Sequence, residues 1–425
     1  MHPTLSRLFH LKRGAMRSTT QNAVARPSRA VAALLLPAVC FIVTLASFNA
    51  AQQTRMAEQP DMTIDAAMRT QVIEGALKAL REGYVYPEVA TRMEQAIRER
   101  LAKKEYEGIT SAKQLAQTLT EHLQAVSRDK HLRVRFSHEA LPEGMGTGRP
   151  VVIRRAPGDG TTTPPAAGAG GDGSPRIIRG GRGGGDMRGL SSNPNAGIEK
   201  VERLEGNIGL LEISVFERLP LATDKVSEAM NKLADTDALI IDLRANGGGA
   251  SGTIRYLMSY FFDKPVHIND YYNRMEDRTD SIYTLAEVPG KRYSDKPIYI
   301  LTSGRTFSAA ESISYSLKNL KRATIVGETT GGGAHPIVPR RLNDHFAVAV
   351  PASRYISPIT KTNWEGTGVE PDLKVPAAHA LKVAQLAALK RLAANKPDDK
   401  AAAQLKSLIE ALQKEVDGLK RETSR

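Results

Sequence analysis

Ser308 is the residue of this chain whose type and surroundings most suggest chemistry. It stands in the stretch TSGRTFSAAESI, between an apolar run and a group of small residues that ends in Glu311. The tetrad SAAE at 308–311 also fits the capping box S-x-x-E of a helix start. The two roles are compatible, because a serine on the first turn has free backbone N–H groups beside it that can stabilise an oxyanion.

Three consecutive glycines form a second candidate element. They lie in the stretch LRANGGGASG, 243–252, directly after the apolar run ALIID. Such a run lets the backbone approach a ligand and turn its N–H groups toward it. A phosphate-binding loop is the rival interpretation, but no Gly-Lys-Ser/Thr follows the glycines. A plain tight turn is the other alternative. Because this run and Ser308 both follow predicted strands and open onto predicted helices, a shared site at the carboxyl ends of the strands is favoured.

A serine nucleophile needs a base and a group that orients the base. His131 lies in SRDKHLRVRF, where a helical region passes into a strand-like run, and Glu365 lies in NWEGTGVEPD. Each also has an ordinary interpretation, as a solvated histidine at a helix end and as a loop glutamate. His335 is predicted to lie in a loop or at a strand edge. Since no H-E-x-x-H or comparable spacing is present, we predict neither a metal site nor a cofactor.

The elements that must position these residues alternate between strand and helix after Gly197. The predicted strands are Asn207–Ile213, Ala238–Leu243, Pro297–Thr302, Ala323–Val326 and Phe346–Val350, and the predicted helices are Ala222–Ala234, Ser251–Phe262 and Ser308–Leu320. The runs ALIIDL and PIYILT are almost wholly apolar, as expected of strands covered on both faces. We therefore predict an α/β fold for 198–376.

The flanking regions have different patterns. Apolar residues recur at helical spacing across 62–139, which predicts a small domain of about three helices. Residues 140–197 are rich in Gly, Pro, Thr and Arg, and we predict a disordered insert there rather than an RNA-binding segment. Charged helical segments at Ala377–Asn395 and Asp399–Arg421 form a C-terminal tail, 377–425, that either packs on a face or joins a partner helix.

The composition excludes a basic binding face on the folded part. The chain has 425 residues, 41% of them hydrophobic, and a net charge of +13. Residues 1–30 hold six Lys or Arg and no acid, and 140–197 hold seven Arg against four acids, so most of the excess lies outside the predicted domains. We therefore expect no nucleic-acid partner.

The N-terminus has the pattern of an export signal, 1–51. A basic stretch precedes the uncharged run VAALLLPAVCFIVTL, 31–45, and small residues follow it. The run is short for a membrane span, so cleavage is favoured over anchoring. The only cysteine, Cys40, lies in this run, which leaves the mature chain without thiol chemistry. We expect the mature protein in a bacterial periplasm or cell envelope.

Four ordered motifs carry a family resemblance: ALIIDLRANGGG, ILTSGRTFSAAES, RATIVGETTGGGAH and WEGTGVEPD. They resemble the C-terminal processing (tail-specific) peptidases, most of all the branch with interphotoreceptor retinoid-binding protein repeats and the tricorn protease core. The resemblance implies a ClpP/crotonase-like catalytic fold with Ser308 as nucleophile. It implies His131 as base and Glu365 as its orienting group. The implied oxyanion donors are Gly248 or its neighbour Gly247, together with Ala309.

Two departures separate the chain from the processing peptidases. Gly333 stands where those enzymes carry a lysine base, and the Gly/Arg-rich insert takes the place of their PDZ domain. The resemblance still implies an exported serine endopeptidase acting on unfolded or tail-exposed polypeptides, with a homo-oligomer as a possible assembly. The alternative is a binding protein for apolar ligands on the same scaffold. Association through the C-terminal helices is a third hypothesis.

Overall fold

The computed structural model describes residues 59–145, 194–394 and 400–423. The predicted export signal and most of the predicted insert lie outside these ranges. No helix within the described ranges combines the length and apolarity that crossing a bilayer would require.

The N-terminal part is helical, as predicted. It comprises α2 (Ala66–Gly83), α3 (Pro87–Ala102) and α4 (Ala112–Ser127). Local sequence fixes the helix starts, because the Asp65 side chain accepts from the N–H of Met68 and the Ser111 side chain accepts from the N–H of Gln114. Pro87 sits at the first position of α3, where a missing N–H costs nothing.

A small antiparallel sheet completes the core of these helices. Its strand order is β1 (Arg133–Phe136), β10 (Phe346–Pro351), β9 (Ile337–Arg341). Phe346, Val348 and Val350 are fully buried in one cluster with the apolar faces of α2, α3 and α4. Phe346–Val350 was predicted as a strand of the α/β region, but it pairs with β1, and its side chains close the helical core. The chain thus returns to its N-terminal part before it reaches Glu365.

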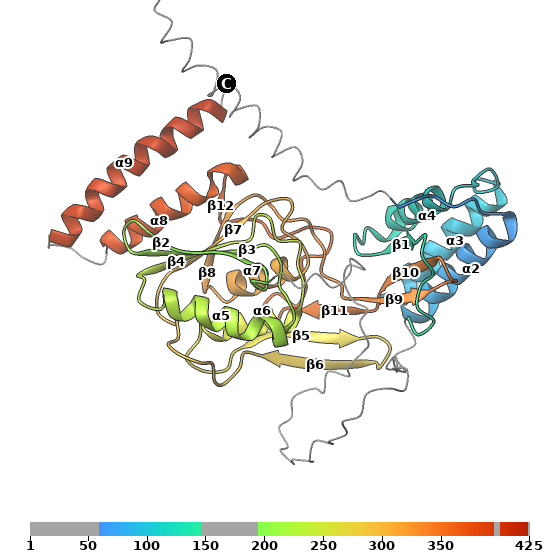
Figure 1. Cartoon of the computed structure of the whole chain (residues 1–425), viewed down its shortest axis with the longest axis horizontal. Helices are drawn as coiled ribbons and strands as arrows, with labels where there is room; N and C mark the ends of the chain where they lie inside the picture. Colours follow the sequence, from blue (N-terminus) through green and yellow to red (C-terminus); the bar gives the residue numbers. More distant parts are fainter. Residues whose placement is uncertain (1–58, 146–193, 395–399, 424–425) are drawn as a thin grey trace, which may run out of the picture. The chain divides into compact units, whose positions relative to one another are not determined.

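The α/β region is built on a six-stranded sheet in the order β12-β8-β7-β4-β3-β2 (Figure 1). All neighbouring pairs are parallel except β2 with β3. The strands are β2 (Ile198–Leu204), β3 (Ile208–Ile213), β4 (Ala238–Asp242), β7 (Ile298–Thr302), β8 (Ala323–Gly327) and β12 (Leu373–Lys374). Every residue of β4 and β7 is buried, which confirms that these apolar runs are covered on both faces.

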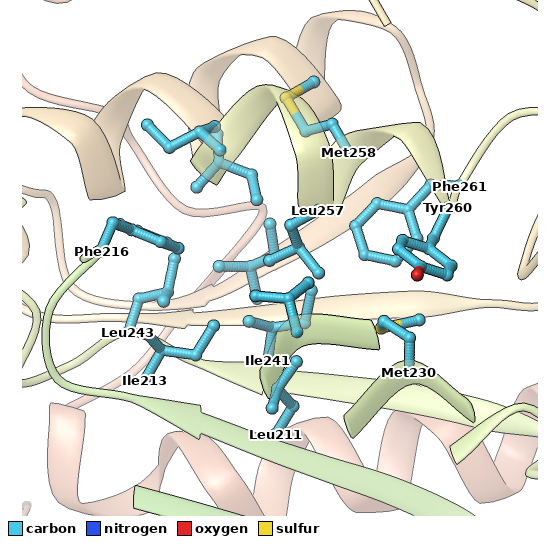
Figure 2. Packing of buried hydrophobic residues seen from close by; sticks show 14 of the residues in the cluster. Leu211, Ile213, Phe216, Met230, Ile241, Leu243, Leu257, Met258, Tyr260 and Phe261 are labelled. Atoms are coloured by element: carbon cyan, nitrogen blue, oxygen red, sulfur yellow. The ribbon is translucent and has the colours of Figure 1, made fainter. Parts of the chain in front are cut away.

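Alternate side chains of the strands face different helix layers. Ile241 and Ile300 join a cluster with α5 (Leu219–Leu233), α6 (Ser251–Ser259) and α7 (Ala309–Asn319). Figure 2 shows Leu211, Ile213 and Ile241 of the sheet with Met230 and Leu257 of this layer. Ile240 and Leu301 instead pack with α8 (Ala380–Ala394), which follows the short 3₁₀ turn η1 (Ala377–His379), and α9 (Lys400–Thr423) packs on α8. The α/β class and the C-terminal helices are confirmed.

A further sheet had no counterpart in the sequence prediction. It has the order β11 (Ser353–Ile356), β5 (His267–Asn273), β6 (Arg278–Tyr283), all antiparallel. Residues of β6 alternate between exposed and half-buried, so this strand offers no apolar run to detect. The guanidinium of Arg274, in the β5–β6 turn, donates to the backbone carbonyls of Tyr84 and Arg81, which ties the hairpin to the end of α2.

Candidate active site

Ser308 occupies a strained turn between β7 and α7. Its φ is 55° and its ψ is −114°, so it lies outside the extended region that an ordinary helix cap adopts. Such a conformation costs roughly 1–3 kcal/mol in a non-glycine residue and persists only where the surroundings impose it. Thr306 and Ser303 supply the constraint, because their hydroxyls donate to the carbonyls of Leu243 at 2.8 Å and Arg244 at 2.6 Å. The serine turn is thereby tied to the start of the glycine loop.

Glu311, the acid of the capping box, is a buried hub rather than an exposed cap. It is 0% exposed, and its Oε2 accepts from the N–H of Ser308 at 2.8 Å. It also accepts from the Thr330 hydroxyl at 2.5 Å and from the N–H groups of Gly332 at 2.6 Å and Gly333 at 2.9 Å. Burial raises the pKa of this carboxyl, while the four donors act in the opposite direction. Glu311 therefore ties Ser308 to the loop that precedes β9.

The glycine loop lies directly against the serine turn. A Cβ on Gly248 would come within 2.9 Å of the Ser308 Cβ and 3.1 Å of the Ala309 nitrogen. The Gly248 N–H donates to Oδ1 of Asn246 at 2.8 Å, so it is engaged within its own loop. A Cβ on Gly247 would meet nothing within 4 Å. Within the part of the chain that the structure describes, the N–H groups of Gly247 and Ala309 have no acceptor, so both can donate to a ligand.

His131 reaches this region from the helical part. Its ring centroid lies 4.7 Å from that of Phe307, the residue before Ser308. A Cβ on Gly333 would lie 2.7 Å from Cε1 of His131 and would also collide with the Phe307 ring. The imidazole therefore fills the space that a side chain at position 333 would need. Burial lowers the pKa of His131 to about 4, against a smaller raising effect of Asp129, and the buried Nδ1 atom has no hydrogen-bond partner.

Two carboxylates lie beside His131. Ligand-type atoms of Asp129, His131 and Glu365 all lie within 4.8 Å of one another. Asp129 is 0% exposed and accepts from the His131 N–H at 3.0 Å, from the Tyr84 hydroxyl at 3.3 Å and from Nδ1 of His335 at 2.7 Å. Because these donors already engage both Asp129 oxygens, the cluster suits proton transfer better than cation binding.

Glu365 completes the cluster from the segment after β11. Its Oε2 accepts from the N–H of Ala334 at 2.5 Å and lies 3.4 Å from Nδ1 of His335. Its Oε1 is buried without a hydrogen-bond partner. Burial first, and then the charge of Asp129, raise the pKa of Glu365 to about 7. The predicted base and orienting group are therefore brought together, in an environment that strongly perturbs both.

Three members of the site were missed by reasoning from the sequence. Asp129 stands two positions before His131, and this short spacing is the sequence feature that could have suggested a role for Asp129 beside the histidine. His335 closes the motif TTGGGAH, but it was interpreted as a loop histidine. Glu311 was assigned only to the helix cap. Their roles depend on contacts between distant segments, which a single sequence does not display.

A cavity of about 480 Å³ opens beside the two loops, and neither Ser308 nor His131 is among its lining residues. Its lining includes Arg244 and Ala245, which come just before the glycine run, and Ser303, Gly304 and Arg305, which come just before the serine turn. Arg244 is fixed by a bidentate ion pair with Asp242, in which the shortest N–O distance is 2.6 Å.

Comparison with known proteins identifies the family. The profile described as "Peptidase family S41" matches residues 207–375, and that of the "N-terminal domain of Peptidase_S41 in eukaryotic IRBP" matches 63–157. Carboxyl-terminal-processing peptidase 2, chloroplastic, of Arabidopsis thaliana is 28% identical over 40% of this chain and 32% of its own length. The carboxy-terminal-processing protease of Bartonella bacilliformis is 27% identical over 41% of this chain and 40% of its own length. The chain thus spans well under half the length of these relatives.

A tricorn protease and two solved structures extend the comparison. The Thermoplasma acidophilum tricorn protease is 26% identical over 42% of this chain and 15% of its own length. A putative peptidase from Parabacteroides merdae superposes with a TM-score of 0.48 at 17% identity, covering 72% of this chain and 90% of that one. The photosystem II D1 C-terminal processing protease gives 0.43 at 18% identity, covering 80% and 100%. The chain thus carries a peptidase family S41 domain over residues 207–375, preceded by an N-terminal S41 domain over 63–157.

Proposed function

We propose that this chain is a serine endopeptidase in which Ser308 attacks the peptide carbonyl and His131 accepts its proton. Ala309 and Gly247 supply the N–H groups for the oxyanion, and Gly248 permits the close approach of the two loops. Glu365 orients the base. Preorganised donors of this kind typically contribute a factor of 10²–10³ each to the rate of acyl transfer.

The single observation that carries the proposal is the position of His131 against Phe307 and Gly333. The ring lies 4.7 Å from the neighbour of Ser308 and fills the space in which a side chain at position 333 would stand. A lysine base at that position would collide with the imidazole, so the histidine and the lysine are alternative occupants of one place. This supports a histidine-based mechanism and accounts for the glycine.

The ionisation of the base suits this role. Burial lowers the pKa of His131 to about 4, so the imidazole is neutral at physiological pH, and its weakened basicity must be offset when it accepts the Ser308 proton. The imidazolium formed on attack requires an anion beside it, and Asp129 and Glu365 are the nearby carboxylates. The imidazolium that forms when His131 takes the Ser308 proton is thus stabilised by these two carboxylates.

The proposed substrate class rests on the peptidase family profile that this chain matches. The peptidase family profile supports a polypeptide substrate, and Arg244 and Arg305 line a cavity beside the serine and glycine loops. We propose unfolded or tail-exposed polypeptides as substrates. The basic stretch and apolar run of residues 1–45 support export of the chain to a bacterial periplasm or envelope.

The test incubates the mature chain with an unfolded polypeptide, such as reduced casein, and measures its hydrolysis. In parallel, apolar molecules are extracted from the purified protein and identified. Hydrolysis that is lost in Ser308→Ala is the expected result. No cleavage of any unfolded chain, together with a stoichiometric apolar ligand extracted from the purified protein, would instead establish a binding protein on this scaffold.

A further inference from the structure

His335 is the least explained group in the site. It is 2% exposed, and the proposed serine mechanism assigns it no step. Its Nδ1 lies 2.7 Å from Oδ2 of Asp129 and 3.4 Å from Oε2 of Glu365. Because an ionised carboxylate only accepts, Nδ1 carries the hydrogen and is the donor that both carboxylates face. A buried imidazole rarely lies between two acids by chance of packing, since each of the three groups costs free energy to bury.

We propose that His335 is a positioning residue of the peptidase site, which holds Asp129 and Glu365 together and favours the ionised form of Glu365 beside His131. The inference rests on the proposed function for its catalytic meaning. It assigns His335 no contact with the substrate and no proton from Ser308. Its role is to fix the carboxylate that faces the base.

The groups around His335 make this role necessary. Two carboxylates that approach each other in a buried site cannot both stay ionised without a donor between them. Burial first, and then the charge of Asp129, raise the pKa of Glu365, whereas His335 lowers it. Other charged or titratable groups near the cluster come from several elements. The Tyr84 hydroxyl donates to Asp129, and the Tyr86 ring centroid lies 5.5 Å from that of His335. The Arg354 guanidinium lies 4.9 Å from the Tyr86 ring centroid, and His131 and Glu311 complete the set.

The consequence for catalysis has a definite sign. With the His335 N–H removed, Glu365 keeps its proton to higher pH, so fewer molecules carry the anion that stabilises the His131 imidazolium. The acid limb of kcat/KM should therefore move upward. An opposite charge or donor within this distance typically shifts a pKa by about 1–3 units. A histidine that only fills space would change the rate or the melting temperature without moving the limb.

Two substitutions separate these roles. His335→Asn keeps an N–H at the position of Nδ1, whereas His335→Leu keeps the bulk and removes the donor. We expect the acid limb to lie near pH 7 in wild type, to shift upward by about one unit or more in the leucine variant, and to lie between the two in the asparagine variant. His345→Asn is the matched control, because the Nδ1 of His345 bonds the backbone carbonyl of Ser137 and lies outside the cluster.

A measurement that needs no activity keeps the proposal separate from the peptidase assignment. In a Ser308→Ala background with ¹³C-labelled glutamate, NMR can follow the Cδ signal of Glu365 as the pH is changed. The midpoint of this titration should be lowest with His335 present, higher in His335→Asn and highest in His335→Leu. If the midpoints shift while no variant hydrolyses anything, the peptidase assignment fails and the positioning role stands. An unchanged midpoint in folded His335→Leu would overturn the positioning role, and so would an asparagine variant that shifts as far as the leucine variant.

Discussion

The serine side and the histidine side of the site differ in how much chain is needed to build them. On the serine side, the loops after β4 and β7 come from neighbouring parallel strands, and short hydrogen bonds from Thr306 and Ser303 join them. On the histidine side, Asp129 and His131 follow α4, His335 precedes β9, and Glu365 follows β11. The first side is a local product of sheet topology, whereas the second depends on the return of β10 to the helical core. Disturbing the helical part should therefore impair the proposed base, His131, before it impairs the proposed nucleophile, Ser308.

Removing the nucleophile should have the largest effect. Ser308→Ala should lower kcat by about 10⁴ or more, because loss of one member of a triad removes almost the whole covalent pathway. The measurement is the turnover of a fluorogenic unfolded substrate. Ser314→Ala is the matched control on the same helix, since its hydroxyl only bonds the Ala310 carbonyl. Equal turnover in the Ser308 variant and wild type would refute the nucleophile assignment.

Replacing the base should come next. His131→Ala should lower kcat/KM by about 10³–10⁴. Lys130→Ala should keep most of the activity, because the Lys130 ammonium is exposed and donates to the Gly331 carbonyl at 2.5 Å. The pair of variants is assayed under identical conditions. A dead Lys130 variant beside a near-normal His131 variant would transfer the role of base to the lysine.

Glu365→Gln should have an intermediate effect on rate, about 10–100-fold, because Asp129 remains beside the base. Stability should change with a defined sign. The pKa of Glu365 is raised to about 7 from 4.5, so its stabilising contribution is complete below pH 4.5 and is lost as pH rises through 7. Between those values the glutamine variant should gain up to about 3 kcal/mol relative to wild type in denaturant unfolding. A pH-independent difference would show that the Glu365 carboxyl is not perturbed by folding.

Deleting residues 147–193 should have the smallest effect. A Gly/Pro/Arg-rich segment with no apolar periodicity buries little surface, and long loops are thermodynamically tolerated. The melting temperature and the rate should both stay close to the wild-type values. A large drop in melting temperature by calorimetry would show that this segment forms a folded module.

The serine side was also the side that the sequence could predict. Each loop on this side follows its strand within a short stretch of sequence, one with the glycine run and the other with a serine at a helix start. The predicted strands Ala238–Leu243 and Pro297–Thr302 match β4 and β7 closely. On the histidine side, the roles of His131 and Glu365 were predicted only through a family resemblance. Asp129 and His335 lie more than 200 positions apart in the chain and meet at 2.7 Å, and no local pattern encodes that contact. The hydrogen bond from the Gly248 N–H to Oδ1 of Asn246 likewise depends on the folded shape of the loop, which the glycine run does not reveal.

The most direct test of the account is to label the mature chain with a fluorophosphonate and map the modified residue by mass spectrometry. Wild type should be modified at Ser308 alone. Labelling should be abolished in Ser308→Ala and slowed strongly in His131→Ala, because the probe requires a serine activated by a base. Absence of labelling in an enzyme that hydrolyses unfolded polypeptide, or modification at another residue, would contradict the claim that Ser308 and His131 act together.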